Sequence, residues 1–342
     1  MHYRILFFLI HFFSCIVDSR VYIGPWTMPR NGTNNQMMCA PKQTDKEPRA
    51  DGTLILQNTT TQKPKSCTPS HKVIDEIIQQ WNKHAATNKP SSVIKNIAKR
   101  SIVQKEEELK HSINDFCQDN KCDTDYTWLP LSISSSMKKY FRPFHSSEWN
   151  TRPNEWLSNF DIDSVLLQYN EVFPSFHYVT SSSIDYDTLI GDDVCVTQQL
   201  CSLDISTLYA SGIRTVGIVF NLDKHTQPGS HWVTVCVSLD QHIFAYIDSN
   251  GNPAPPSIRR LYHTIVKQAT QANIIKTDDQ LVYIENFTRY QTTNTECGMF
   301  CIYFLILAIY RFPIQTMIET MIQQRYQFND TYMRQLRTQL FN

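Results

Sequence analysis

Four residues of this chain have the side-chain types and the order that acyl transfer through a thioester requires. They are His231, Asp248, Gln291 and Cys297. Cys297 is followed, after one glycine, by an apolar stretch at residues 299–312, which predicts a thiol at the start of a buried helix. A helix N-terminus favours the thiolate, and the thiolate is the nucleophilic form of cysteine. A histidine and a carboxylate activate and orient such a nucleophile, so this order of residues predicts covalent catalysis.

The spacing of these residues predicts how they come together. His231 precedes one segment of alternating apolar residues and Asp248 closes the next, 17 positions later (248 − 231 = 17). Two antiparallel strands joined by a tight turn at residues 240–241 would return both polar ends to one edge of a sheet. Gln291 lies 6 positions before Cys297 (297 − 291 = 6), close enough to place its amide beside the thiol. With the backbone N–H of Cys297, that amide would form a two-donor oxyanion hole.

Each of these residues taken alone has a simpler interpretation. A lone cysteine before an apolar helix is usually a small core residue, and a lone histidine beside a tryptophan usually packs. Their joint occurrence, in order and at workable spacing, favours a catalytic site. We expect His231 to deprotonate or ion-pair with Cys297 while Asp248 orients the imidazole. Cys301 lies one helical turn further in, where burial would raise the pKa of its thiol, so we interpret it as a core residue.

Glycines and an aromatic residue flank the same segments. The chain has only nine glycines, and Gly229, Gly251 and Gly298 lie next to the candidate site, where they predict turns or close backbone approach. Gly298 either lets a substrate backbone come near the thiol or allows simple packing. Trp232 either packs against and shields the imidazole of His231 or fills the core.

These motifs resemble those of the adenovirus-protease and Ulp1-like superfamily of cysteine peptidases. The superfamily pattern reads here as His231-Trp232, Asp248-Ser249, Gln291 and Glu296-Cys297-Gly298. Within the superfamily, the strings at residues 156–169 and 221–232 look most like the thiol proteases of large double-stranded DNA viruses. The string that begins at Ser66, with the helix after it, looks like the region that precedes the catalytic part of those proteins. The resemblance covers roughly residues 66–315.

The resemblance implies an α+β fold of the papain-like or Ulp1-like type. Such a fold has a mixed central sheet with a buried nucleophile helix, here preceded by a helical N-terminal accessory region. Trp156 and the leucine after it are similar to the Trp-Leu pair that precedes the first helix in Ulp1-like enzymes. Trp156, Trp232 and Gly298 are the residues that we expect to contact substrate.

The activity that the resemblance implies is that of a cysteine-type peptidase, a hydrolase. Viral relatives cut structural polyproteins after small residues of the Gly-Gly-x type during virion maturation, which would place the enzyme in the virion or the host cytoplasm. Ulp1-like relatives instead remove ubiquitin-like modifiers such as SUMO. A cysteine-dependent acetyltransferase is a third possibility, but Gln291 and the Asp-Ser pair favour a peptidase. A non-catalytic interaction protein is disfavoured because all four residues are present.

Composition agrees with an ordinary enzyme of one main domain plus an accessory region. Lys+Arg and Asp+Glu both number 32, so no broad polyanion-binding surface is implied and nucleic acid is not an expected partner. The ten cysteines include no Cys-x2-Cys pair, so we expect neither a metal nor another cofactor. Cys117 and Cys122 would form a disulfide in an oxidising compartment and remain free thiols in a reducing one. A monomer is favoured.

The chain divides into four segments on composition. Residues 1–20 are apolar with a basic start, which indicates a secretory signal, a membrane anchor or an upstream start-codon artefact. Residues 21–65 are rich in Thr, Asn, Gln, Lys and Pro and predict a disordered linker. Residues 66–140 are the helical accessory region, with helices expected from Thr68-Pro69 and over 91–116, and residues 141–342 are the protease domain.

Within the protease domain, alternation of apolar residues predicts strands at 215–221, 232–238, 243–248 and 281–287. A helix is expected at 257–271, after a proline-rich turn at 252–256. The stretch at 299–310 is apolar on every side, which is typical of a buried helix.

Overall fold

The computed structural model describes residues 71–95, 100–120, 143, 145, 147–191, 193–323 and 328–341. The predicted N-terminal segment (1–20) and linker (21–65) lie outside these residues. So do Cys122 and the side chain of Cys117, which we expected to pair in an oxidising compartment. No helix in the described part of the chain is long and apolar enough to cross a membrane.

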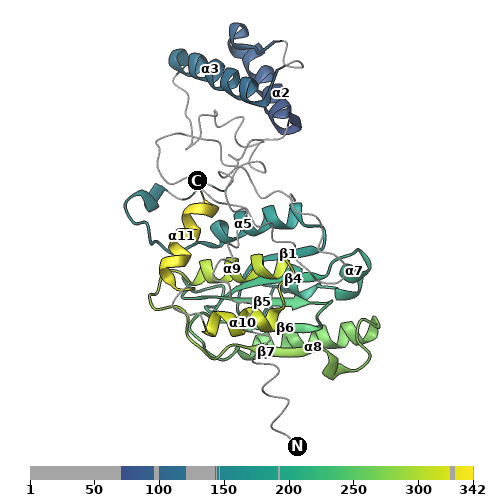
Figure 1. Cartoon of the computed structure of the whole chain (residues 1–342). Helices are drawn as coiled ribbons and strands as arrows, with labels where there is room; N and C mark the ends of the chain where they lie inside the picture. The colour runs from purple at the N-terminus through teal and green to yellow at the C-terminus, as the bar shows by residue number, and fades with distance from the viewer. Residues whose placement is uncertain are drawn as a thin grey trace, which may run out of the picture.

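Two helices, α2 (His71–Asn88) and α3 (Ile102–Asn120), form a pair in the accessory region (Figure 1). Trp81 and Phe116 meet edge to face with ring centroids 5.4 Å apart. The buried Lys105 bonds Asp75 across the pair at 2.5 Å. The second helix begins later than predicted, because residues 90–92 form only a short 3-10 turn, η1 (Pro90–Ser92). That turn closes back on α2 through a hydrogen bond from Trp81 Nε1 to Ser92 O (2.9 Å).

The larger part of the described chain, from residue 147 onward, is built around a five-stranded mixed sheet in the order β1-β4-β5-β6-β7 (Figure 1). β4 pairs with β5 and β5 with β6 in antiparallel register, while the two outer pairs, β1 with β4 and β6 with β7, are parallel. The strands are β1 (Phe176–Ser183), β4 (Thr215–Asn221), β5 (Trp232–Ser238), β6 (Ile243–Ile247) and β7 (Val282–Glu285). A separate two-stranded ribbon joins β2 (Leu189–Ile190) and β3 (Val194–Cys195).

Helices cover both faces of this sheet. The helical elements of this part of the chain are η4 (Ser147–Asn150), α5 (Asn159–Val172), α6 (Gln198–Cys201), α7 (Ile205–Ala210), α8 (Pro256–Gln271), η5 (Asp278–Gln280), α9 (Cys297–Ile309), α10 (Ile314–Gln323) and α11 (Asp330–Leu340). One core lies between the sheet and α5, α9, α10 and α11, and the other lies between the sheet and α7 and α8. The result is a three-layer α+β fold, as the resemblance implied.

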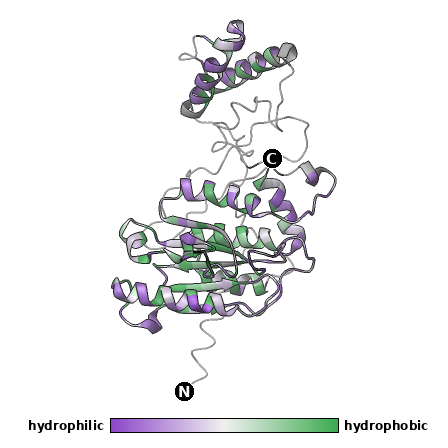
Figure 2. Ribbon diagram, turned by 180° about the vertical axis from the view of Figure 1, so that it is seen from behind, coloured by the Kyte–Doolittle hydropathy of each residue, from purple (hydrophilic) through white to green (hydrophobic). Residues whose placement is uncertain are grey.

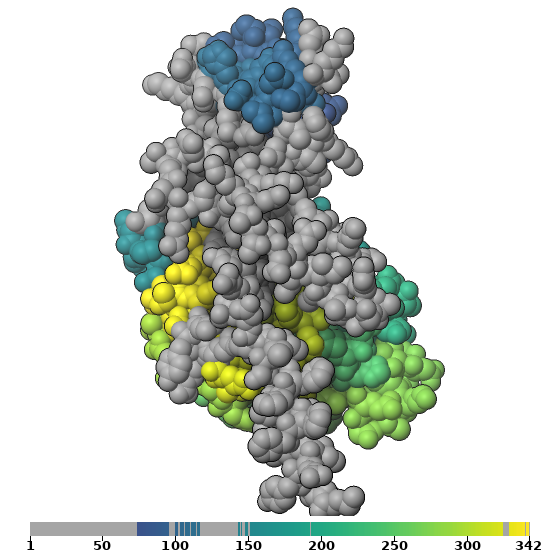
Figure 3. Space-filling model, in the orientation of Figure 1, coloured from purple at the N-terminus to yellow at the C-terminus, as the bar shows by residue number. Residues whose placement is uncertain are grey.

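The helix α9 occupies the centre of one core. All of its residues from Cys297 to Ile309 are buried, which is why the sequence is apolar on every side there. In Figure 2 this helix is among the most hydrophobic parts of the molecule. The C-terminal helices, in yellow in Figure 3, reach the molecular surface. The protein therefore inserts the N-terminus of a buried helix, with Cys297, into the middle of the fold.

The predicted strands agree with the structure at β4, β5 and β6. β7 is shorter than the predicted 281–287, because the chain leaves the sheet at Asn286, whose side chain bonds Asp248, and Phe287 is exposed. The sequence did not predict β1, the β2–β3 ribbon, α10 or α11. β1 was missed because its alternation is broken by a bulge between Tyr178 and Ser181, where Thr180 has a φ of 30°.

Candidate active site

The register of β5 and β6 brings His231 and Asp248 together. His231 directly precedes β5 and Asp248 directly follows β6, and Thr234 pairs with Ile247 across the two strands. Both polar residues therefore lie at one edge of the sheet, as their spacing predicted. His231 Nε2 and Asp248 Oδ1 are 2.5 Å apart, with side chains 12% and 0% exposed.

The carboxylate of Asp248 accepts three further hydrogen bonds from the turn that follows it. The N–H of Asn250 donates to its Oδ1 (2.8 Å), and the N–H and side-chain amide of Asn252 donate to its Oδ2 (3.1 and 2.9 Å). Burial raises the pKa of Asp248, but its hydrogen bond to His231 and the charge of His231, with the donors of Asn250 and Asn252, hold that pKa below its ordinary value. Asp248 is therefore held as a carboxylate facing the imidazole.

Asn286 fixes the backbone of Asp248 from the neighbouring chain segment. Its Oδ1 accepts the N–H of Asp248 (2.9 Å), and its Nδ2 donates to the carbonyl oxygen of Asp248 (2.7 Å) and to that of Thr288 (3.0 Å). Asn286 is 2% exposed, so its amide is fully occupied inside the protein. In sequence Asn286 stood out only as the first residue of an Asn-x-Thr triplet.

The imidazole of His231 lies between Asp248 and Cys297. Burial lowers the pKa of His231, but hydrogen bonds to Asp248 and Cys297, together with the charges of both, outweigh burial and raise it to about 9. A His231 with this pKa is protonated at neutral pH when an anion faces it. The arrangement therefore suits an imidazolium paired with a thiolate.

Cys297 is the first residue of α9 and is 2% exposed. The other free cysteines among the described residues are Cys236 and Cys301, and both are buried. Burial raises the pKa of Cys236 to about 12 and raises the pKa of Cys301 as well, where the neighbouring Cys297 and Asp248 add to the effect. These two are core residues, as we expected for Cys301. Only Cys297 combines a free thiol with a histidine partner in this part of the chain.

Gln291 is held in one orientation beside the site. Ser249 Oγ donates to Gln291 Oε1 (2.6 Å), and the N–H groups of Tyr290 and Gln291 both donate to the carbonyl oxygen of Ser249. With its carbonyl oxygen occupied in this way, the side chain of Gln291 keeps its NH₂ group as a donor. The serine after Asp248 thus orients the glutamine, which gives the Asp-Ser pair a physical role.

An open hollow in the protein surface is lined in part by His231 and Gln291. Its lining consists of Trp156, Ser230, His231, Asn250, Arg289, Gln291, Thr293 and Asn294. Trp156 is 40% exposed on its wall. Arg289 is tied to the loop by a bond from its Nε to the carbonyl oxygen of Gln291 (2.6 Å). His231 and Arg289 are among these lining residues and no acidic residue is, so the hollow favours negative charge.

The other two residues that we expected to contact substrate, Trp232 and Gly298, are buried and are not among the residues that line the hollow. Trp232 is 8% exposed and its Nε1 donates to the carbonyl oxygen of Leu157 (2.8 Å). A Cβ added to Gly298 would lie 3.1 Å from two atoms of Leu157 and 3.3 Å from Ile162, so close packing explains this glycine. The structure therefore assigns both residues to holding the Trp156-Leu157 segment in place rather than to the lining of the hollow.

Turns and close approach explain the other two glycines as predicted. Gly251 has a φ of 73°, and a Cβ there would lie 2.8–3.0 Å from the backbone of residues 287–289. Gly229 has a φ of 98°. The loop after Asp248 can pack against the segment before Gln291 only because Gly251 has no side chain.

The comparisons with known proteins agree with this geometry. Residues 214–341 match the Ulp1 protease family, C-terminal catalytic domain. A putative thiol protease of Acanthamoeba polyphaga mimivirus is 28% identical over 172 residues, which are 50% of this chain and 54% of the relative. A cysteine protease of African swine fever virus is 24% identical over 273 residues, 75% of this chain and 92% of the relative. The part of the chain that carries Asp248 and Cys297 thus matches the catalytic domain of the Ulp1 protease family, and the similar viral proteins are named thiol or cysteine proteases.

The fold of the chain also resembles that of a solved viral protease. The crystal structure of a protease of African swine fever virus aligns with a TM-score of 0.54 and 18% identity, over 91% of this chain and 97% of that one. The match to the mimivirus relative, by contrast, spans only about half of that protein's length, at 54%.

One covalent feature of the chain was not predicted. Cys195 and Cys201 form a disulfide that ties β3 to α6. Their separation of 6 positions carries no signal that distinguishes them among ten cysteines. Among the described residues, no group of three His, Cys, Asp or Glu side chains is placed to hold a metal ion.

Proposed function

We propose that this protease is an endopeptidase in which Cys297 is the nucleophile, His231 the general base and acid, and Asp248 the group that orients His231. The observation that carries the proposal is the position of His231, bonded to Asp248 at 2.5 Å on one side and to Cys297 on the other. Gln291 and the backbone N–H of Cys297 would supply the oxyanion hole.

The reaction follows from these positions. The thiol proton passes to His231, and Cys297 Sγ forms a bond to the peptide carbonyl carbon, whose oxygen becomes the oxyanion. His231 returns the proton to the leaving amine as the C–N bond breaks, which leaves a thioester. Water then attacks the thioester with His231 as base, and the acid product leaves while the thiol is restored.

We propose that the scissile bond follows small residues of the Gly-Gly-x type, within viral structural polyproteins. Cys297 is only 2% exposed, and Trp156 lines the hollow together with His231 and Gln291, which supports a substrate with little side-chain bulk at the cleaved bond. Similarity to viral thiol proteases supports the polyprotein and, with it, a location in the virion or the host cytoplasm.

A second candidate is the removal of a ubiquitin-like modifier. Relatives from African swine fever virus are named SUMO-1 cysteine proteases, one of them 23% identical over 273 residues. Modifiers of this class also end in Gly-Gly, so a site that takes small residues at the cleaved bond would admit them.

The test is cleavage of a panel of Gly-Gly-x peptides and of SUMO and ubiquitin fusion proteins by the full chain. The Cys297→Ala variant is the inactive control, and Cys301→Ala controls for the loss of a nearby thiol. Peptide cleavage lost only in Cys297→Ala supports the maturation protease. Cleavage confined to folded fusions supports the second candidate. Cleavage that survives Cys297→Ala contradicts both.

A further inference from the structure

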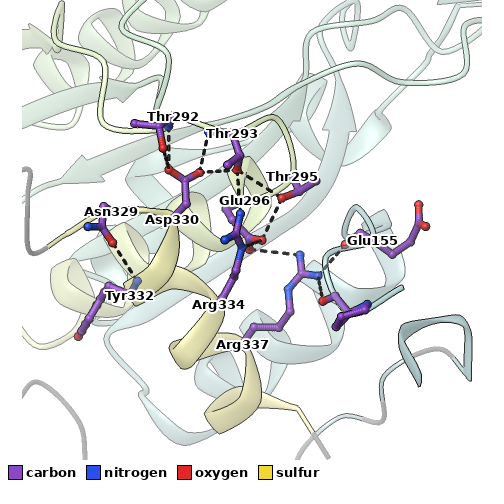
Figure 4. A network of polar contacts seen from close by, with 11 residues as sticks. Glu155, Thr292, Thr293, Thr295, Glu296, Asn329, Asp330, Tyr332, Arg334 and Arg337 are labelled. Atoms are coloured by element: carbon purple, nitrogen blue, oxygen red, sulfur yellow. Dashed lines mark hydrogen bonds and ion pairs between the residues drawn. The ribbon is translucent and has the colours of Figure 1, made fainter. Parts of the chain in front are cut away.

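A single helix far along the chain contacts both ends of the segment that carries Gln291 and Cys297. We call residues 291–297 the nucleophile loop. The helix is α11, which follows Cys297 by more than thirty positions and is the last helix of the described chain. Figure 4 shows its side chains converging on this loop.

At the start of the nucleophile loop, Asp330 accepts four hydrogen bonds. Its Oδ2 accepts from Thr292 N (2.7 Å) and Thr292 Oγ1 (2.5 Å), and its Oδ1 accepts from Thr293 N (3.2 Å) and Thr293 Oγ1 (2.7 Å). Asp330 is 3% exposed. Burial raises the pKa of Asp330, but these donors hold it below its ordinary value, so a buried carboxylate fixes the two residues after Gln291.

At the end of the nucleophile loop, Glu296 lies between two arginines of α11. Glu296 is 0% exposed. Its carboxylate forms ion pairs with Arg334 Nε at 3.3 Å and with Arg337 Nη2 at 3.4 Å. Thr295 Oγ1 adds a hydrogen bond of 3.0 Å. A buried carboxylate beside the nucleophile would oppose a thiolate unless positive charge balanced it.

Arg337 is built into the protein rather than lying on its surface. It is 3% exposed, donates to the carbonyl oxygens of Pro153 and Glu155 at 3.0 and 2.7 Å, and lies 4.5 Å over the ring of Trp149. Its charge also interacts with that of Cys297. Arg337 therefore joins the segment before Trp156, the helix α11 and the start of α9.

We propose that α11 positions the catalytic groups: Asp330 fixes the nucleophile loop behind Gln291, and Arg334 and Arg337 neutralise Glu296 so that negative charge can form on Cys297. The proposal rests on Cys297 being the nucleophile. Asp330, Arg334 and Arg337 are positioning residues, since their contacts are to the loop and not to the hollow's substrate side.

The charged and titratable groups around this part of the site come from several elements. His231 and Asp248 face Cys297 from the ends of β5 and β6, and Cys301 lies within α9. Arg337 also interacts with Asp161 of α5 and with Arg334. Of these groups, the charge variants below replace only Arg337, together with Glu296 in one of them.

The charge arm of the test measures alkylation of Cys297 by iodoacetamide in the full chain, followed by mass spectrometry across pH. Arg337→Met and Arg337→Lys both disturb the bonds to residues 153 and 155, but only the lysine keeps the charge. We expect the acid limb of the rate profile to move up by about one pH unit in Arg337→Met, so that the rate at a fixed pH on that limb falls about tenfold. Arg337→Lys should keep the wild-type profile.

A rescue variant separates charge from packing. Glu296→Gln combined with Arg337→Met removes both charges and should return the acid limb to its wild-type position. An unshifted limb in Arg337→Met, or the same shift in Arg337→Lys, would overturn the charge role. Buried Cys236 and Cys301 report unfolding, because they react only if the variant opens. A wild-type Cys297 that never reacts would instead count against the proposed function itself.

The geometric arm uses 4-nitrophenyl acetate, whose acyl transfer needs an oxyanion hole but no peptide specificity. In Asp330→Asn, an amide NH₂ replaces one acceptor and faces threonine donors. We expect acylation of Cys297 to slow by about tenfold or more, since a well-placed oxyanion donor is worth on the order of 100- to 1000-fold. Alkylation by iodoacetamide, which forms no oxyanion, should not change.

The matched control is Gln335→Ala, an exposed residue on the same helix. It should leave both rates at the wild-type level. Asp330→Asn with acylation within twofold of wild type would overturn the positioning role. A parallel fall in alkylation and acylation would also overturn it, because that pattern indicates general loss of structure.

Discussion

Burial and the partners of His231 shift the pKa of its imidazole in opposite directions, and the effect of the partners is larger. Burial alone would leave a neutral ring, whereas Asp248 and Cys297 together raise the pKa of His231 to about 9. Asp248 can do this because Asn250, Asn252 and Asn286 hold it as an oriented carboxylate. The small polar groups around Asp248 therefore help to keep it charged and fixed beside the imidazole.

Gln291→Ala tests the residue expected to bind the oxyanion. We expect kcat to fall on the order of 100- to 1000-fold, because one preorganised donor to the oxyanion is lost, while KM changes little. Steady-state kinetics on the peptide that the panel identifies measure the effect. Ser249→Ala is the companion variant, because it releases Gln291 Oε1 without removing the amide. It should show a smaller fall in kcat, and unchanged turnover in Gln291→Ala would contradict the assignment.

At the scale of elements, the site depends on loops brought very close to one another. The turn after β6 packs against the segment that follows β7, and Gly251 is the point of contact. That packing places Asp248, at the start of the turn, and Gln291, just after the segment, on the same side of the sheet. The two loops act as one support for the site.

Gly251→Ala tests this contact. Gly251 and Gly191 both have a positive φ, 73° and 66°, but a Cβ at Gly251 would meet backbone atoms 2.8–3.0 Å away, whereas at Gly191 nothing lies within 4 Å. Both alanine variants carry the cost of the left-handed backbone, about 1–2 kcal/mol. Only Gly251→Ala should add a steric cost of about 1–3 kcal/mol.

Urea unfolding of the two variants measures the difference in their free energies of unfolding. Gly251→Ala should also lower kcat, since the loop that it displaces carries Asp248, while Gly191→Ala should keep wild-type kcat. Equal destabilisation by both variants would mean that the loops relax apart without cost.

At the scale of the whole molecule, titration of these groups limits stability on both sides of neutral pH. The pKa values of Asp248 and Asp330 lie below their ordinary value in the folded protein. Their stabilisation is therefore fully present above the unfolded pKa of about 3.9 and is lost as pH falls through the depressed folded values. His231 behaves oppositely. Its stabilisation is present below 6.5 and is lost as pH rises toward about 9.

Thermal unfolding between pH 3 and 10 checks this expectation. We expect the melting temperature to be highest between about pH 5 and 7 and to fall on both sides. His231→Gln should lose more stability at pH 6 than at pH 9.5, since the ion pair that it removes is weakened at the higher pH. An equal loss at both pH values would show that Asp248 and Cys297 do not raise the pKa of His231.

The order of the four candidate residues, the strands β4 to β6 and the buried helix α9 were all predictable from the sequence. Each depends on local information: strand alternation, a turn at residues 240–241, and an apolar run behind Cys297. Even the meeting of His231 with Asp248 follows from two consecutive strands, because antiparallel pairing returns the chain to its starting edge.

Tertiary structure alone decided which groups support that site. Asp330 contacts Thr292 from 38 positions away, and Arg337 reaches the carbonyl oxygen of Pro153 from 184 positions away. No periodicity in sequence signals such pairs, because they exist only once helices from distant parts of the chain pack on one sheet. The candidate catalytic residues can thus be predicted from their local sequence. The balance of buried charge around Cys297, by contrast, depends on the packing of distant parts of the chain.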